Sequence, residues 1–140
     1  MPKISLIVAA YNIEDYIERC VKSLINQTFT DIEIVIVNDG STDGTLDKIK
    51  RVIKNDNRVK LINKKNEGVV AARKTGFINS TGEYILFIDG DDWLDVNTCQ
   101  ICNEKLIEDN YDILYYGYYM AYDNGKNIRV DVKEEILKDK

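Results

Sequence analysis

Four nearly continuous apolar runs stand out along the chain, at residues 4–10, 32–37, 59–62 and 84–88. Each run is short and is followed by a polar or glycine-containing segment. Apolar runs of this length are typical of strands in a parallel sheet that helices cover on both faces. We therefore predict four buried strands at these positions.

The stretches between the runs repeat apolar residues every three or four positions, as one face of a helix does. The repeats are Ile13, Ile17, Val21 and Leu24, then Leu46, Ile49, Val52 and Ile53, and then residues 69–77, with a fourth helix over about 95–109. Asn12 is the expected N-cap of the first helix, and Ser41-Thr42-Asp43 offers capping residues for the second. Strands that alternate with helices predict an open α/β sheet with right-handed crossovers.

The chain becomes aromatic after residue 109, because six of its nine tyrosines fall between 111 and 122. Asn124-Gly125 is a signal for a two-residue hairpin turn, so residues 111–122 and 127–132 are predicted to pair antiparallel. A half-buried hairpin at the sheet edge is favoured over tyrosines that stack on bases. Ile136 and Leu137 then open a helix-like pattern. We expect one domain over residues 1–140, truncated on its C-terminal side.

Composition narrows the classes of function. The chain contains no His, which excludes His-based general bases, Ser-His-Asp or Cys-His triads and His-ligated zinc. Its 44% of hydrophobic residues can build a core, and its net charge of −5 argues against a nucleic acid as partner. The longest apolar stretch is too short to cross a bilayer. A reducing, cytoplasmic setting is expected, and peripheral association of the parent protein with the inner face of the membrane is compatible with it.

Cys99 and Cys102 form a lone C-x-x-C pair, which redox or zinc chemistry could use. These cysteines also share a helical face with Val96 and Leu106, and Cys packs well as a small hydrophobic residue. Core packing is the favoured interpretation.

Polar, acidic segments follow three of the predicted strands. These segments are Tyr11-Asn12, residues 38–44 and Asp89-Gly90-Asp91-Asp92. Ligands of open α/β sheets bind at the carboxyl ends of the strands, where these segments would gather. Three acids within four residues repel one another, and their spacing suits a divalent cation shared with a diphosphate. A solvated, acidic helix N-terminus is the alternative.

Two residues of these segments have specific interpretations. Asp39 could accept the N3–H of uracil or thymine, or it could belong to an ordinary turn and capping segment. Gly90 would let the backbone approach a ligand closely. The chain has neither G-x-G-x-x-G after its first strand nor a P-loop motif, which argues against dinucleotide and P-loop binding.

Taken together, these segments resemble the N-terminal part of a family 2 glycosyltransferase with the GT-A fold, over about residues 3–125. The residues that carry the resemblance are 4–12, 37–43, Asn66-Glu67-Gly68 through Ala72-Arg73, and 87–92. Ala9 stands where the family often has Pro. The resemblance implies a Rossmann-like, mostly parallel sheet flanked by helices, here with a C-terminal antiparallel hairpin.

The resemblance also implies a site for a nucleotide-sugar donor, with a UDP-sugar favoured, and a DxD motif that binds Mg²⁺ or Mn²⁺. Tyr11 would flank the base, Asp39 would accept its N3–H, and Arg73 would lie near the base or diphosphate. Asp89 would bind the ribose hydroxyls, and Asp91 would bind the metal with Asp92 in support. The remaining members of the implied donor site are Ala9, Asn12, Asn66, Gly68 and Gly90.

The implied reaction transfers the sugar to a saccharide or lipid-linked acceptor, as in polysaccharide or cell-surface glycan biosynthesis. In inverting members a carboxylate base activates the acceptor, and here the base is expected beyond Lys140. Two alternatives stay open. One is a sugar-nucleotide uridylyl-type transferase, whose glycine- and arginine-rich first loop is missing. The other is a donor-binding fragment or module without transfer activity.

Overall fold

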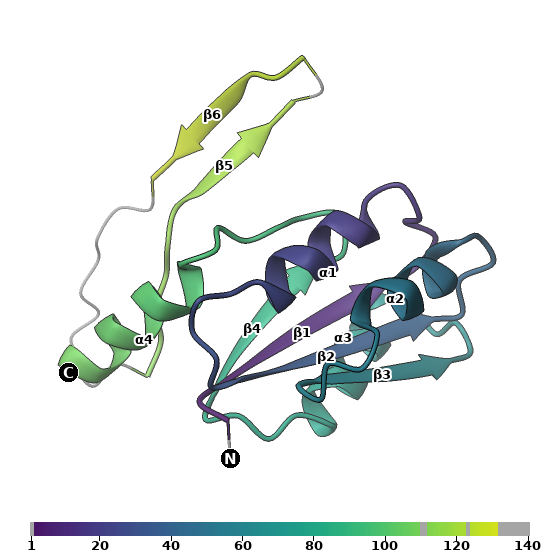
Figure 1. Cartoon of the computed structure of the whole chain (residues 1–140), viewed down its shortest axis with the longest axis horizontal. Helices are drawn as coiled ribbons and strands as arrows, with labels where there is room; N and C mark the ends of the chain where they lie inside the picture. The colour runs from purple at the N-terminus through teal and green to yellow at the C-terminus, as the bar shows by residue number, and fades with distance from the viewer. Residues whose placement is uncertain (1, 110–111, 123, 132–140) are drawn as a thin grey trace. The chain divides into compact units, whose positions relative to one another are not determined.

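The structure, a computed structural model, describes residues 2–109, 112–122 and 124–131. Two compact units divide the chain, with the boundary between Asn103 and Glu104. The first unit holds the predicted α/β sheet, and the second holds an antiparallel hairpin (Figure 1). None of the helices that the structure describes has the length and apolarity that a membrane crossing requires.

Four parallel strands form the sheet of the first unit, in the order β3-β2-β1-β4. They are β1 (Ile4–Ala10), β2 (Ile32–Asp39), β3 (Val59–Lys64) and β4 (Tyr84–Asp89). All four predicted strands are confirmed. Three of them extend past their apolar runs, so that Asp39, Lys64 and Asp89 are the last residues of strands. These polar side chains therefore stand on the sheet itself.

Helices cover both faces of this sheet, as the continuous apolar runs require. They are α1 (Ile17–Ile25), α2 (Thr45–Ile53) and α3 (Val69–Ile78). Figure 1 shows α1 and α2 in front of the sheet and α3 behind it. Alternate residues of β1 serve the two faces: Leu6 and Val8 pack in the larger core with α1 and α2, whereas Ile7 packs with Ala72 of α3.

The expected N-cap of the first helix is wrong. α1 begins at Ile17 after Tyr16, and Asn12 has a φ of 48° in the loop before it. The Asn12 side chain instead accepts the backbone N–H of Thr42 at 2.8 Å. This contact with a distant loop replaces the local cap that the sequence indicates. For α2, Asp43 accepts the N–H of Thr45 at 3.0 Å, one position before the N-cap Gly44.

The fourth helix, α4 (Thr98–Asp109), starts three residues later than about residue 95 and crosses from the first unit into the second. Cys99 and Leu106 are buried and Cys102 is half-buried, which agrees with packing. Val96 is 44% exposed because it lies before the helix, so its place on the predicted face is wrong. Burial raises the pKa of the Cys99 thiol to about 12, which opposes thiolate chemistry.

The predicted hairpin is confirmed in the second unit, with β5 (Tyr118–Ala121) and β6 (Asn127–Val130) paired antiparallel. Tyr122 donates its backbone N–H to the Lys126 carbonyl, so the connection is longer than two residues. The two strands form a sheet of their own and do not extend the four-stranded sheet, so the expected place at its edge is wrong. Expectations for Tyr111, Asp123, Val132, Ile136 and Leu137 lie outside the described residues.

Candidate functional site

A cavity of about 550 Å³ opens at the carboxyl ends of the strands, within the first unit. It is lined by Ala9, Ala10, Tyr11, Ile13, Asp39, Asn66, Gly68, Val69, Ala72, Arg73, Asp89, Gly90 and Asp91. Every donor- or metal-binding residue that the resemblance implies lines this cavity, except Asn12 and Asp92. The structure therefore brings together residues from four separate segments of the sequence.

The strand register explains why these polar residues share one face. Asp39 pairs with Lys64 across β2 and β3, and Ala9 pairs with Asp89 across β1 and β4. Residues at the same register position point to the same face of a sheet. This is the face that α3 covers, since Ile7, two residues before Ala9, packs against that helix. The cavity thus forms between the strand ends and the first half of α3.

Asp39 is the most buried acid of the cavity, with 2% of its surface exposed. Its carboxylate accepts the Lys64 ammonium at 3.0 Å, the Gly68 N–H at 2.8 Å, and the Glu67 N–H at 3.1 and 3.2 Å to its two oxygens. Burial alone raises the pKa of Asp39, but these hydrogen bonds outweigh it and hold the pKa below its ordinary value. The group is an ionised acceptor that also fixes the start of α3.

Arg73 and Asp89 form an ion pair within the cavity lining, from an Arg73 Nη to the Asp89 carboxylate. Both side chains are partly exposed, at 41% and 52%. The Arg73 Nε is buried and has no hydrogen-bond partner among the described residues. The guanidinium therefore keeps a donor that the described protein does not use.

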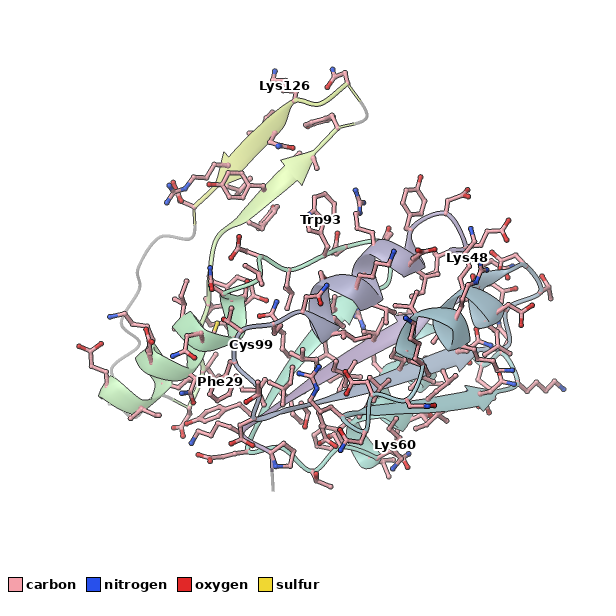
Figure 2. The ribbon with its side chains drawn as sticks, in the orientation of Figure 1. Phe29, Lys48, Lys60, Trp93, Cys99 and Lys126 are labelled. Atoms are coloured by element: carbon pink, nitrogen blue, oxygen red, sulfur yellow. The ribbon has the colours of Figure 1, made fainter. Side chains whose placement is uncertain are left out.

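The acidic turn after β4 lines the cavity with only part of its residues and also contacts α1. Asp91 lines the cavity, whereas Asp92 does not. Burial raises the pKa of Asp92, and the charges of Asp91 and Asp89 raise it further. Arg19 of α1 stacks over the Trp93 ring at 3.7 Å from its centroid and approaches the Asp91 carbonyl at 3.5 Å. Trp93 is labelled in Figure 2. Arg19 is a cation beside this turn that the sequence alone did not indicate.

Gly90 has a packing reason to lack a side chain. A Cβ at this position would lie 2.2 Å from Cδ1 of Ile13 and 3.3 Å from the Ala9 carbonyl oxygen. The predicted reason was the approach of the backbone to a ligand, and Gly90 does line the cavity. Close packing against the loop after β1 is an additional constraint on this glycine.

The loop after β1 is fastened to the loop after β2. Asn12 binds Ser41 and Thr42, through its backbone N–H at 3.1 Å and its side-chain oxygen at 2.8 Å. Asp43 accepts the Glu14 N–H at 3.1 Å, and the Glu14 carboxylate accepts the Gly44 N–H at 2.7 Å. Asn12, which follows Tyr11 in the chain, thus holds the two loops together and does not line the cavity.

Sequence reasoning missed several members of the site. Lys64 contacts Asp39 because it ends β3 directly opposite the end of β2. The sequence could indicate this contact only if the order of the strands were known. The apolar lining residues that were missed are Ala10, Ile13, Val69 and Ala72. All four occupy positions that the hydrophobic pattern assigns to a strand or to a helix, so their type does not mark them as site residues.

Comparison with known proteins places the chain in a family. Residues 5–139 match the family model "Glycosyl transferase family 2". Glycosyltransferase GlyA of Streptococcus pneumoniae is 42% identical over 117 residues, which are 84% of this chain and 17% of GlyA. Such a match covers most of the present chain and a small part of its relative.

Solved structures share the fold. S. aureus TarS, solved with UDP-GlcNAc, superposes with a TM-score of 0.71 at 33% identity, covering 76% of this chain and 31% of that one. The mannosyltransferase PcManGT from Pyrobaculum calidifontis, solved with GDP-Man and Mn²⁺, has a TM-score of 0.68 at 26% identity, covering 75% and 32%. The chain spans less than a third of the length of these relatives. It belongs to glycosyl transferase family 2 and has the GT-A fold.

Proposed function

We propose that the cavity binds the nucleotide-sugar donor of a glycosyltransferase, with UDP as the favoured nucleotide and Mg²⁺ or Mn²⁺ as cofactor. The observation that carries this proposal is the gathering of Tyr11, Asp39, Arg73, Asp89 and Asp91 around one cavity of about 550 Å³. A cavity of that volume falls within the usual range for a small-molecule site, about 300–1,000 Å³. The structures of TarS with UDP and PcManGT with GDP-Man support a nucleotide in the related site.

Tyr11 and Asp39 would recognise the base. Tyr11 is 48% exposed at the cavity, so its ring has a face free for stacking on a base. The ionised Asp39 only accepts hydrogen bonds, which matches the N3–H of uracil. Cytosine has no proton at N3 when neutral. The proposed site therefore distinguishes UDP from CDP through one hydrogen bond.

Asp89 and Arg73 would hold the ribose and the diphosphate. An exposed carboxylate such as that of Asp89 accepts hydrogen bonds from two vicinal hydroxyls. The Arg73 guanidinium is planar and carries several donors, which suits phosphate oxygens. Their ion pair orients both groups before a ligand arrives.

The acidic turn would offer carboxylate oxygens to a hard divalent cation. Asp89 and Asp91 line the cavity and Asp92 follows them in the turn. Among the described residues no three acidic, His or Cys groups form a preformed metal site, so the protein would supply only one or two ligands. Mg²⁺ and Mn²⁺ favour such oxygens, and Mg²⁺ takes few protein ligands when phosphates complete its coordination shell. A bound cation would offset the negative charge that develops on the leaving diphosphate. Asp91 is the proposed ligand, with Asp92 in support.

The parent protein would transfer the sugar to an acceptor hydroxyl, with inversion at the anomeric carbon. A single displacement of this kind needs a base to take the acceptor proton. The chain has no His, so an Asp or Glu is the candidate type. We assign no base among the described residues. The acceptor, a saccharide or a lipid-linked group, stays part of the proposal.

Titration calorimetry with UDP tests the proposal. We expect the wild-type chain to bind UDP more tightly with Mn²⁺ than with a chelator. Asp91→Ala should abolish the Mn²⁺-dependent part, and Asp92→Ala should weaken it less. Lys74→Ala, an exposed change on α3 outside the cavity lining, is the matched control. Equal UDP affinity with Mn²⁺ and with chelator would remove the metal from the proposal, and no UDP binding at all would remove the donor site.

Release of nucleoside diphosphate separates an enzyme from a binding module. UDP-sugar is incubated with the chain in the presence and absence of saccharide acceptors, and the free UDP is measured. Acceptor-dependent release identifies a transferase. Binding of UDP without any release identifies a donor-binding module.

A further inference from the structure

Lys64 is a half-buried cation beside the carboxylate that we propose as the base-recognition group. Its side chain is 16% exposed, and its ammonium lies 3.0 Å from Oδ1 of Asp39. The same ammonium donates to the Lys65 carbonyl at 3.2 Å and pairs with the Glu67 carboxylate. Since Lys64 and Asp39 occupy one register position of β3 and β2, the backbone ladder fixes this contact.

The hydrogen bonds of Asp39 use both of its oxygens. An ionised carboxylate offers about four lone-pair positions. Lys64 and the Glu67 N–H bond to Oδ1, and the Gly68 N–H and the same Glu67 N–H bond to Oδ2. The divided Glu67 contact, at 3.1 and 3.2 Å, is the longest of these. A single ligand N–H in the cavity that Asp39 lines, such as the N3–H of uracil, would displace one half of this divided contact.

We propose that Lys64 is a positioning residue for base recognition, which holds the Asp39 carboxylate in the orientation in which it accepts a base N–H from the cavity. This inference rests on the proposed function, and it adds a residue on β3 that touches no ligand itself. Lys64 does not line the cavity and acts through Asp39. Removal of its charge should change the pH at which Asp39 stops accepting a hydrogen bond.

Of the charged side chains that the structure describes around Asp39, Lys64 is the one that contacts its carboxylate. Lys64 from β3 contacts it directly, and Glu67, from the segment before α3, donates only its backbone N–H to it. Arg73 from α3 and Asp89 from β4 line the same cavity but pair with each other. Tyr11, after β1, and Asp91, after β4, complete the titratable lining. Lys64 is thus the cation in ion-pair contact with Asp39 among the described residues.

A pH-dependent double-mutant cycle tests this role. UDP affinity is measured from pH 3 to pH 8 for wild type, Lys64→Met, Asp39→Asn and the double variant. Wild type is compared with Asp39→Asn, and Lys64→Met is compared with the double variant. The ratio of UDP affinities within each pair isolates the contribution of Asp39, and the protonation of the diphosphate cancels because it affects both members of a pair. Far-UV circular dichroism at each pH confirms that the proteins remain folded.

We expect the contribution of Asp39 to UDP affinity to be lost in Lys64→Met at a pH about one unit or more above the pH at which wild type loses it. This is the size of pKa shift that an adjacent cation produces. Lys64→Arg keeps the charge and should follow wild type. Glu67→Gln, the matched control, removes the other partner of Lys64 and should not move the loss to higher pH. Loss at the same pH in Lys64→Met and wild type would overturn the inference, as would an Arg variant that behaves like Met.

A ligand-free measurement keeps this outcome separate from the proposed function. The ¹³C signal of the Asp39 carboxyl, assigned by its absence in Asp39→Asn, is followed during an acid titration of the protein without nucleotide. A midpoint that moves upward in Lys64→Met supports the role of Lys64 in holding Asp39 ionised, and an unmoved midpoint overturns it. If wild type binds no UDP while the midpoint moves, the proposed function fails and the effect of Lys64 on Asp39 stands.

Discussion

The Asp39 carboxylate is nearly inaccessible to water, so protein donors must replace its hydration. Lys64 and two backbone N–H groups do so, and the same contacts fix the segment that opens α3. Burial of a charge is tolerated only when hydrogen bonds of this kind compensate it. One residue therefore both shapes the cavity and presents an acceptor inside it.

Base choice is the prediction that belongs to Asp39. We expect the wild-type chain to bind UDP more tightly than CDP by roughly 1–3 kcal/mol at pH 7, the cost of leaving a buried polar group unpaired. Asp39→Asn should shrink that difference, because an amide offers both a donor and an acceptor. Calorimetric affinities of both nucleotides for both proteins measure it. Equal affinity of wild type for UDP and CDP would remove Asp39 from the base site.

Glu33 is a second acid whose burial is compensated by hydrogen bonds, and it lies at the opposite end of the sheet from the cavity. Its carboxylate accepts the Ser5 hydroxyl at 2.6 Å, the Gly82 N–H at 2.9 Å and the Thr81 N–H. Burial raises the pKa of Glu33, but these hydrogen bonds outweigh it and set the pKa below its ordinary value of 4.5. The turn between α3 and β4 is thereby tied to β1 and β2.

The pH dependence of stability follows from the lowered pKa of Glu33. Its contribution is fully present above the ordinary pKa of 4.5 and is lost as the pH falls through the lower value of the folded state. Glu33→Gln should lower the unfolding free energy at pH 7 by about 1–3 kcal/mol and flatten its decline below pH 5. Urea unfolding from pH 3 to pH 7 measures both effects. Asp15→Asn, an exposed change, should reproduce neither of them.

At the scale of elements, α3 lies unusually close to β1. A Cβ on Gly76 would stand 2.3 Å from Cγ2 of Ile7 and 3.5 Å from Cγ2 of Val37. The small residues Ala72 and Gly76 are the buried ones on this helix. This close approach sets where the first half of α3, with Val69 and Arg73, meets the strand ends.

Gly76→Ala should therefore destabilise the protein by about 1–3 kcal/mol, the usual cost of overpacking. Helix propensity alone would favour Ala by about 1 kcal/mol, so the sign of the effect decides between packing and propensity. Chemical denaturation measures it, with Lys74→Ala as the exposed control on the same helix. Ile7→Ala combined with Gly76→Ala should cost less than the sum of the single changes. A stabilised Gly76→Ala would contradict the close packing.

The loops after β1 and β2 act as one element of the site. Asp43 accepts N–H groups of Glu14 and Thr45, and Asn12 accepts that of Thr42. Asp43→Ala should lower stability by about 1 kcal/mol or more and weaken UDP binding, because Tyr11 loses its fixed support. Thermal unfolding and calorimetry check these effects, and Asp47→Ala on the exposed side of α2 is the control. Unchanged UDP affinity in a destabilised Asp43→Ala would separate the loop contact from the site.

The elements that sequence predicted well are those whose pattern is local. Buried strands such as Ile4–Ala10 are visible as apolar runs, because a parallel sheet covered on both faces needs them. The start of α1 was missed because Ile13 continues the helical stripe while tertiary hydrogen bonds hold its loop open. Lys64 was missed for a related reason, since its contact with Asp39 depends on strand order and register. The hairpin was expected at a sheet edge and forms a separate sheet, because local pattern does not say which sheet a strand joins.

At the scale of the whole chain, all cavity residues belong to the first unit, so ligand binding should stabilise that unit selectively. UDP with Mn²⁺ at 100 times its dissociation constant adds about 2.7 kcal/mol to the stability of the state that binds it. Amide hydrogen exchange should slow in β1, β2, α3 and β4, which surround the cavity. Exchange in β5 and β6 should stay unchanged, because no lining residue comes from them.

Hydrogen exchange monitored by mass spectrometry, with UDP and Mn²⁺ added to the 140-residue chain, measures this distribution directly. Asp91→Ala under the same conditions controls for effects of the added metal and nucleotide that do not involve the cavity. Slower exchange confined to the sheet of the first unit is the expected outcome, because a ligand protects the cooperative unit whose opening would release it. Equal protection of Tyr118–Ala121 would contradict the prediction that the ligand stabilises the first unit selectively, because no residue of that strand lines the cavity.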